Sequence, residues 1–247
     1  MDFSGVIQSE QDYKLFVKYL FSISKNESVE HKARHIAIIN TKQNVIAIAM
    51  SSIRKTAKKI LKNGYDWFLN YSLNNSYHNE YYEETLIQGL VIAEIKDLEK
   101  QKSYFELWIK KIDNWSTCDS TVSTMKFLKN SSQKSNYFKF YLNLCFCEDE
   151  FVARFGIIVL MTCYLEEMYI DDIFEMCRKV KSDLYYINMA LAWLLSYAFM
   201  SFKAKTYKLF GEKSLSKFVQ NKAICKCRDS FQVLKEDKEN LINYRLK

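Results

Sequence analysis

The chain has 247 residues, of which 49% are hydrophobic and 15% aromatic, so it can bury a large core and does not have the composition of a disordered protein. It contains no proline and only five glycines, which leaves few of the residues that form tight β-turns and favours an all-helical protein over a β-rich one. The 36 basic and 29 acidic residues give a net charge of +7, which suits a nucleic-acid partner without requiring one.

Apolar residues recur at helical spacing in segment after segment, and each segment predicts one helix. The segments are 11–24, 45–62, 81–96, 102–113, 120–129, 136–146, 149–165, 169–180, 184–202, 213–228 and 236–246. Short polar joints such as residues 129–136 separate them, and the candidate N-caps are Asp149, Asp171 and Ser182. Helix pairs joined in this way favour an α-solenoid with a single domain over residues 1–247, while the loose spacing between pairs leaves a compact irregular bundle open.

Residues 184–202 carry no charge and are long enough to be considered as a membrane span. Asn188, Ser196, Ser201 and several tyrosines lower the hydropathy of this run. We therefore interpret it as a helix that is buried on most sides within a helical stack, and we expect no membrane association.

The seven cysteines are an odd number, and the first residues of the chain lack a signal-peptide pattern, so we expect free thiols in a reducing cytoplasm. The C-x-C pairs Cys145/Cys147 and Cys225/Cys227 do not have zinc spacing, and the three histidines do not supply companion ligands. We expect no metal site.

The stretch KIDNWSTCDSTVS, residues 111–123, places Trp115 four residues before Asp119. Residues four apart lie on one face of a helix, so both side chains can point into the same groove if one helix includes them. From these residues alone, the favoured interpretation is that Trp115 is a core anchor and Asp119 an exposed or capping acid. Asp113 and Ser116 are the candidates for capping the helix.

Five segments occur in the order, and with similar spacing, found in one known family: YYEETLIQGLVIAEIK, IDNWSTCDSTV, FVARFGIIVLM, YYINMALAWLLSYAF and NKAICKCRDSFQVLKEDKENL. In them the chain resembles the DNA alkylation repair proteins of the HEAT-like-repeat DNA glycosylase type, from roughly residue 31 to the C-terminus. The resemblance implies an all-α, curved α-solenoid of HEAT-like repeats that holds double-stranded DNA in a basic concave groove. It also implies excision of positively charged N3- and N7-alkylated purines, with no cofactor and no need of a partner subunit, so we expect a monomer.

Carried over residue by residue, the family's catalytic aspartate falls on Asp119 and the aromatic residue before it on Trp115. An alkylated purine already bears positive charge and leaves without protonation, so the enzyme needs to stabilise the oxocarbenium-like sugar and position a water, which a carboxylate does. The family's arginine falls on Arg154, which would hold a phosphate. Its second tryptophan falls on Trp193, which with Trp115 would attract the cationic nucleotide.

Each of the other candidate residues has a plainer explanation. Trp193 lies in a strongly apolar segment, which favours core packing, and Arg154 is alternatively a surface arginine opposite Glu148 or Asp149. The basic residues Lys222, Lys226, Arg228 and Arg54 would clamp the DNA backbone, and solvated helix faces explain them equally well.

Glu83 and Glu84 are expected to cap a helix or order a neighbouring turn and not to catalyse.

The sequence departs from the family pattern at its N-terminal end. A motif like G-V-R-x-P-x-L-R is replaced by AIAMSSIR, so glycine, the first arginine and proline become Ala47, Ala49 and Ser51, and Arg54 survives. A tyrosine found upstream in the family falls on His31. Ser196 follows Trp193 at a position where a basic residue can occur.

Three functions therefore remain open. Retention of Asp119 favours a glycosylase, whereas the altered N-terminal motif favours a non-catalytic helical-repeat protein that binds damaged, bent or branched DNA. A helical scaffold that binds protein would have a concave face lined by acidic or apolar residues instead of Lys and Arg.

Overall fold

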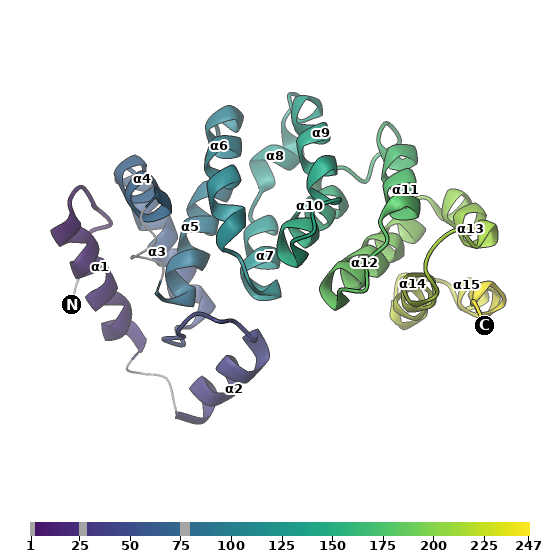
Figure 1. The fold of residues 1–247 in the computed structure, drawn as a ribbon, viewed down its shortest axis with the longest axis horizontal. Helices are drawn as coiled ribbons and strands as arrows, with labels where there is room; N and C mark the ends of the chain where they lie inside the picture. The colour runs from purple at the N-terminus through teal and green to yellow at the C-terminus, as the bar shows by residue number, and fades with distance from the viewer. Residues whose placement is uncertain (1–2, 25–28, 75–79) are drawn as a thin grey trace. The chain divides into compact units, whose positions relative to one another are not determined.

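The computed structural model describes residues 3–24, 29–74 and 80–247. These ranges form fifteen α-helices and no strand (Figure 1). Within them, Asn44 and Tyr81 form an isolated β-bridge. The prediction of an all-α fold is confirmed. The chain divides into two compact units, Met1–Leu128 and Lys129–Lys247, and the single domain expected from the sequence stays a prediction.

In the first unit one central helix, α5, is buried along its whole length. The helices up to the unit boundary are α1 (Glu10–Ile23), α2 (Val29–Ile39), α3 (Met50–Lys62), α4 (Asp66–Asn74), α5 (Tyr82–Ala93), α6 (Leu98–Trp108), α7 (Trp115–Val122) and α8 (Lys126–Asn130), whose last residues lie beyond it. α5 packs against α3, α6 and α7, and α4 packs against α6 (Figure 1). This packing of neighbouring helices is consistent with helical repeats.

Gly89 allows α7 to approach α5 closely. A Cβ atom at Gly89 would lie 2.3 Å from Thr121 Oγ1 and 2.3 Å from Cζ2 of the Trp108 ring. The Trp108 indole fills the space beside this glycine and donates a hydrogen bond from Nε1 to the Thr85 carbonyl, at 2.8 Å. The position of α7, and of the candidate residues on it, therefore depends on the absence of a Cβ atom at Gly89.

Two buried carboxylates order the backbone around the start of α5. Glu83 is 0% exposed and accepts hydrogen bonds from the N–H groups of Ile46, at 3.0 Å, and Ala47, at 2.7 Å. Glu84 is 1% exposed and accepts from the Tyr81 N–H, at 3.0 Å, and from the Tyr13 hydroxyl. The expectation that these glutamates cap a helix or order a neighbouring turn is confirmed.

The Glu83 contacts also correct one predicted helix. Residues 45–49 lie outside α3, which begins at Met50, and the Glu83 carboxylate holds this segment in a non-helical conformation through the N–H groups of Ile46 and Ala47. Ala47 takes a left-handed backbone conformation with φ of 65°.

One predicted helix was divided differently, and three helices were missed. The predicted helix 120–129 is two helices, since Asn114 caps α7 and a turn at residues 123–125 separates it from α8. The helices α2, α4 and, in the second unit, α13 were not predicted; each is short, with 11, 9 and 10 residues, and mixes polar with apolar residues.

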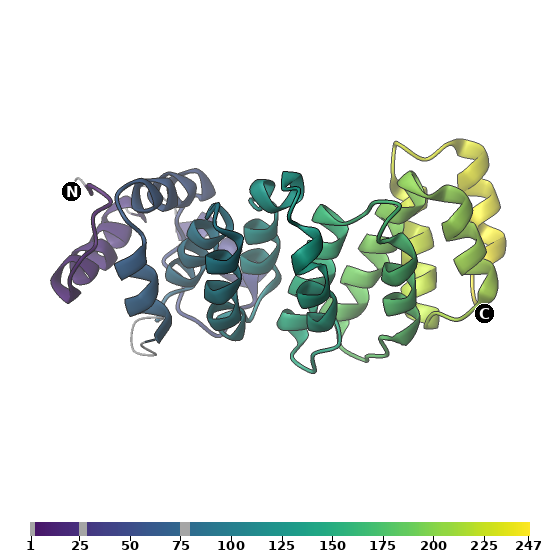
Figure 2. The same ribbon diagram turned by 90° about the horizontal axis from the view of Figure 1, so that it is seen from above.

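In the second unit the apolar helix α12 is the centre of the packing. The helices are α9 (Ser135–Leu144), α10 (Glu150–Cys163), α11 (Ile170–Lys179), α12 (Tyr185–Ser201), α13 (Lys203–Glu212), α14 (Lys217–Asp229) and α15 (Lys235–Asn240). α12 packs against α10, α13 and α14, which accounts for its apolar sequence, and the C-terminal residues, drawn in yellow, lie at one edge of this unit (Figure 2). Among the described helices none combines the length and hydropathy needed to cross a membrane.

Asp149 is the N-cap of α10, as predicted, and its carboxylate accepts from the N–H groups of Phe151 and Val152. The other two predicted N-caps were wrong. The N-cap of α11 is Tyr169, with Asp171 inside the first turn, and the N-cap of α12 is Leu184, two residues after Ser182.

Candidate functional site

Trp115 and Asp119 both lie on α7, one turn apart. Asn114 is the N-cap of this helix and accepts from the Thr117 N–H at 2.9 Å, so Asp119, in the interior of the helix, is not a capping acid. Trp115 is half-buried, lies outside the core and donates from Nε1 to the Ile38 carbonyl at the end of α2, at 3.2 Å. Asp119 is also half-buried. The two side chains therefore share one partly exposed face of α7.

Asp113 and Ser116 do not cap α7, contrary to the prediction, because other partners hold both side chains. The Asp113 carboxylate accepts from the Thr41 hydroxyl, at 2.7 Å, and from the Lys42 N–H, also at 2.7 Å. The Ser116 hydroxyl is hydrogen-bonded to the Tyr82 hydroxyl at 2.8 Å. These contacts fix the start of α7 against α5 and the segment that follows α2.

Arg54 projects from α3 toward the end of α7, where its Nη1 donates to Thr124 Oγ1 at 2.9 Å. Of the neighbouring altered positions, Ala49 is the N-cap of α3 without a side-chain hydrogen bond, and Ser51 is exposed in the first turn. The side chain of His31 lies outside the described residues.

Arg154 is buried in the second unit, so the alternative of a surface arginine is wrong. Its side chain is 5% exposed, and Nη1 donates to the Tyr186 carbonyl at 3.1 Å. The guanidinium also lies 5.8 Å from the centre of the Tyr186 ring. Glu150 accepts from the Tyr186 N–H at 2.7 Å and helps to fix this first turn of α12.

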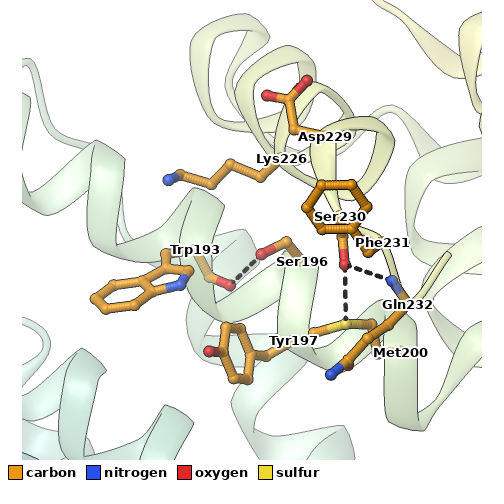
Figure 3. A pocket seen from close by; sticks show the side chains of 9 residues that line it. All are labelled: Trp193, Ser196, Tyr197, Met200, Lys226, Asp229, Ser230, Phe231 and Gln232. Carbon is orange, nitrogen blue, oxygen red and sulfur yellow. Dashed lines mark hydrogen bonds between the residues drawn. The ribbon is translucent and has the colours of Figure 1, made fainter.

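Trp193 is half-buried and lines a pocket, so the alternative of core packing is also wrong (Figure 3). The pocket has a volume of about 500 Å³. Its lining includes Trp193, Tyr197, Met200, Lys226, Asp229 and Phe231. The Trp193 and Tyr197 rings are 6.0 Å apart at an interplanar angle of 80°, and Lys226 Nζ lies 5.9 Å from the centre of the Trp193 ring.

Positive charge is concentrated beside this pocket. Burial lowers the pKa of Lys226, and the neighbouring charges of Lys222 and Arg154 lower it further, while Asp229 acts in the opposite sense. Lys222 and Lys226 are four residues apart on α14 and share a face. Arg228 lies on a different face of the same helix, so the structure brings together two of the three predicted residues of this basic cluster.

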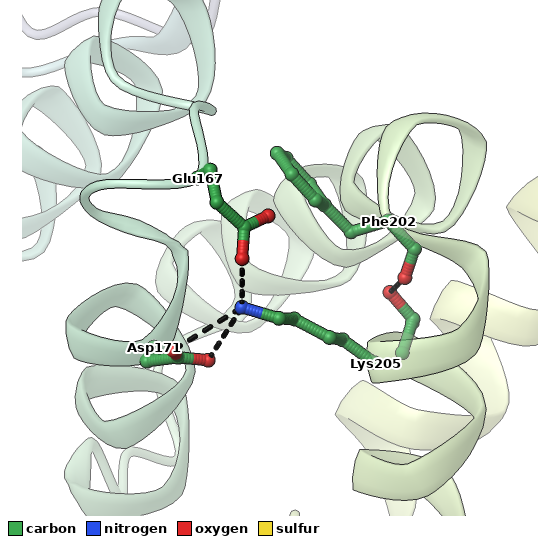
Figure 4. Close-up of polar contacts among 5 residues, drawn as sticks. Glu167, Asp171, Phe202 and Lys205 are labelled. Carbon is green, nitrogen blue, oxygen red and sulfur yellow. Dashed lines mark hydrogen bonds and ion pairs between the residues drawn. The ribbon is translucent and has the colours of Figure 1, made fainter.

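Several other basic residues of the second unit are held by carboxylates. Lys205 Nζ lies 2.6 Å from Glu167 and 3.2 Å from Asp171 (Figure 4). Lys203 pairs with Asp237 at 2.8 Å. In the described ranges, by contrast, no carboxylate lies within 4.0 Å of the ammonium or guanidinium nitrogens of Lys222, Lys226 or Arg228.

Sequence reasoning missed the aromatic neighbours of Trp193. Tyr197 had a usable signal, since it is four residues after Trp193 on the same helix. Phe231 had none, because it belongs to the loop between α14 and α15.

All seven cysteines are free thiols. Within the described part of the chain no group of three His, Cys, Asp or Glu side chains has a metal-binding arrangement.

A model of the DNA alkylation repair enzyme family matches residues 18–200, well over half of the chain. The chain belongs to this family. The matched stretch includes Arg54, Trp115, Asp119, Arg154 and Trp193, whereas Lys222, Lys226 and Arg228 follow it. No curated protein matches the chain. Membership of a DNA alkylation repair enzyme family implies a DNA substrate.

Proposed function

We propose that this member of the DNA alkylation repair enzyme family is a monofunctional DNA glycosylase that excises N3- and N7-alkylated purines from duplex DNA. The observation that carries the proposal is the pair Trp115 and Asp119 on one partly exposed face of α7, where Asn114 already caps the helix. An aromatic face and a carboxylate placed one turn apart suit a cationic nucleotide whose sugar becomes positively charged during the reaction.

The chemistry follows from the charge of the substrate. The bond between the sugar C1′ and the alkylated purine breaks, its electron pair neutralises the purine, and the sugar becomes oxocarbenium-like. The Asp119 carboxylate stabilises that positive charge and orients a water, whose oxygen bonds to C1′ and whose proton passes to the carboxylate or to solvent. The product is an abasic site, and neither a metal nor a lysine Schiff base takes part.

Residues of both units would contact the DNA. In the first unit, the guanidinium of Arg54 is placed beside the end of α7 and would bind a phosphate. In the second unit, Arg154, Lys222 and Lys226 supply positive charge beside Trp193, and Arg228 adds charge on another face of α14. The enzyme would act as a monomer on DNA in the cytoplasm.

Release of 7-methylguanine and 3-methyladenine from methylated duplex DNA, measured with the wild type and with Asp119→Asn, tests the proposal. We expect the wild type to release both bases. The variant should release them more slowly, by on the order of 10²–10³-fold or more, because removal of a charge-stabilising group from an active site has an effect of this size. If neither protein releases base and both bind duplex DNA with strong salt dependence, the chain is a DNA-binding module. Equal release by both proteins would remove Asp119 from the mechanism.

A further inference from the structure

The pocket beside Trp193 is larger than a phosphate contact needs. Its volume of about 500 Å³ falls in the range of clefts that bind small molecules, roughly 300–1,000 Å³. The Ser196 hydroxyl donates back to the Trp193 carbonyl at 2.7 Å, so this side chain stays against its own helix and leaves the space open (Figure 3).

Phe231 is an aromatic side chain without a role in the fold of this unit. It is 103% exposed, although it belongs to the lining of the pocket. The turn that carries it is ordered by Ser230, whose hydroxyl accepts from the Gln232 N–H at 3.2 Å and contacts Met200 Sδ at 3.7 Å (Figure 3). A ring that is held in water by an anchored turn has its full apolar area available to a ligand.

The charges around the pocket select the kind of ligand. Lys226, Lys222 and Arg154 attract anions toward the Trp193 side. The Asp229 carboxylate lines the pocket itself, which disfavours a phosphate inside it and provides an acceptor for an amino group. A nucleotide fits this division, because its flat base enters among aromatic rings while its phosphates remain with the cations.

We propose that this pocket receives one unstacked base of the DNA strand, with Phe231 closing over that base. The proposal rests on the proposed DNA function and adds to it a binding site for an extrahelical base in the second unit. Aromatic side chains stack on any base, so the site recognises local loss of base pairing more than sequence.

Binding to two duplexes that differ in a single unpaired adenine tests the proposal. We expect the wild type to bind the bulged duplex about tenfold more tightly than the fully paired one, and Phe231→Ala to lose that preference. Leu234→Ala is the matched control, because Leu234 belongs to the same loop, is 65% exposed and does not line the pocket. Since Phe231 is fully exposed, its loss should leave the helical circular dichroism spectrum unchanged.

The outcomes separate this site from the proposed function. Equal affinity of the wild type for both duplexes, or an undiminished preference in Phe231→Ala, overturns the base-binding site and leaves the glycosylase proposal standing. Failure to bind either duplex overturns both.

Discussion

Asp113 and Asp119 are six residues apart and have different environments. The Asp113 carboxylate is occupied by Thr41 and Lys42, which fasten the segment after α2 to the start of α7. Asp119 lies within α7 on the face that it shares with Trp115. Asp113 therefore has a structural role, and the face shared with Trp115 makes Asp119 the candidate for catalysis.

Ala47 has a backbone conformation that favours glycine, with φ of 65°. We predict that Ala47→Gly changes the free energy of unfolding by less than about 0.5 kcal/mol, because relief of the left-handed conformation, about 1–2 kcal/mol, offsets the greater flexibility of glycine and the lost methyl group. The matched variant is Ala57→Gly, at a buried alanine in the interior of α3. It should lower that free energy by about 2 kcal/mol. Urea denaturation measures both, and equal losses would contradict the account.

Glu84 should make the stability of the first unit depend on pH. Burial raises the pKa of this carboxyl from 4.5 to about 7, against the opposing hydrogen bonds from Tyr13 and Tyr81. Because the pKa is higher in the folded state, the stability that it contributes is present below about pH 4.5 and is lost as the pH rises through about 7. The free energy of unfolding of the wild type, relative to Glu84→Gln, should fall by up to about 3 kcal/mol over this interval.

Glu94→Gln, at the C-cap of the same helix, is the control and should follow the wild type across this pH range. A constant difference between wild type and Glu84→Gln from pH 4.5 to 7 would show that the Glu84 carboxyl titrates normally.

At the scale of the helices, the approach of α7 to α5 at Gly89 positions the candidate catalytic face. We predict that Gly89→Ala lowers the free energy of unfolding by about 1–3 kcal/mol, because the new methyl group would overlap the Thr121 and Trp108 side chains. Gly211→Ala is the control, since a Cβ atom there would meet its nearest neighbour, in Tyr244, at an ordinary 3.7 Å. That change should raise stability by up to about 1 kcal/mol. Similar effects of the two substitutions in thermal or urea unfolding would contradict this role of Gly89.

Sequence periodicity located the long buried helices, and it failed where a tertiary contact determines the backbone conformation. The apolar run 184–202 corresponds closely to α12, because burial on several sides requires that composition. Residues 45–49 have an equally helical pattern, yet the Glu83 carboxylate, almost forty residues away in sequence, binds their N–H groups. The helices α2, α4 and α13 are too short for their periodicity to stand out.

The candidate site could be predicted in part. The four-residue spacing of Trp115 and Asp119 correctly implies a shared face, and the resemblance to the repair family selects these residues among many others. The position of Lys226 over the Trp193 ring depends on the packing of α14 against α12, which spacing along the chain does not encode. Phe231 lies in a loop, where no helical periodicity could indicate its position.

At the scale of the whole molecule, the net charge of +7 matters less than which basic residues are already paired. We predict that Lys222→Ala weakens binding to duplex DNA and lowers the slope of log K against log salt by about 1, the effect of one lost phosphate contact. Lys205→Ala should leave the slope unchanged, because Glu167 and Asp171 already hold that ammonium group. Equal slopes for Lys222→Ala and the wild type in a salt titration would exclude Lys222 from the DNA contact.

If Asp119 acts on the chemical step, its substitution should slow the single-turnover release of 7-methylguanine at saturating protein. We predict that Asp119→Asn binds methylated duplex DNA about as tightly as the wild type and releases base on the order of 10²–10³-fold more slowly or worse. Asp113→Asn, measured under conditions where it is folded, should keep a near wild-type rate. A wild-type rate in Asp119→Asn, or an equal loss in both variants, would exclude a specific role of Asp119 in the chemical step.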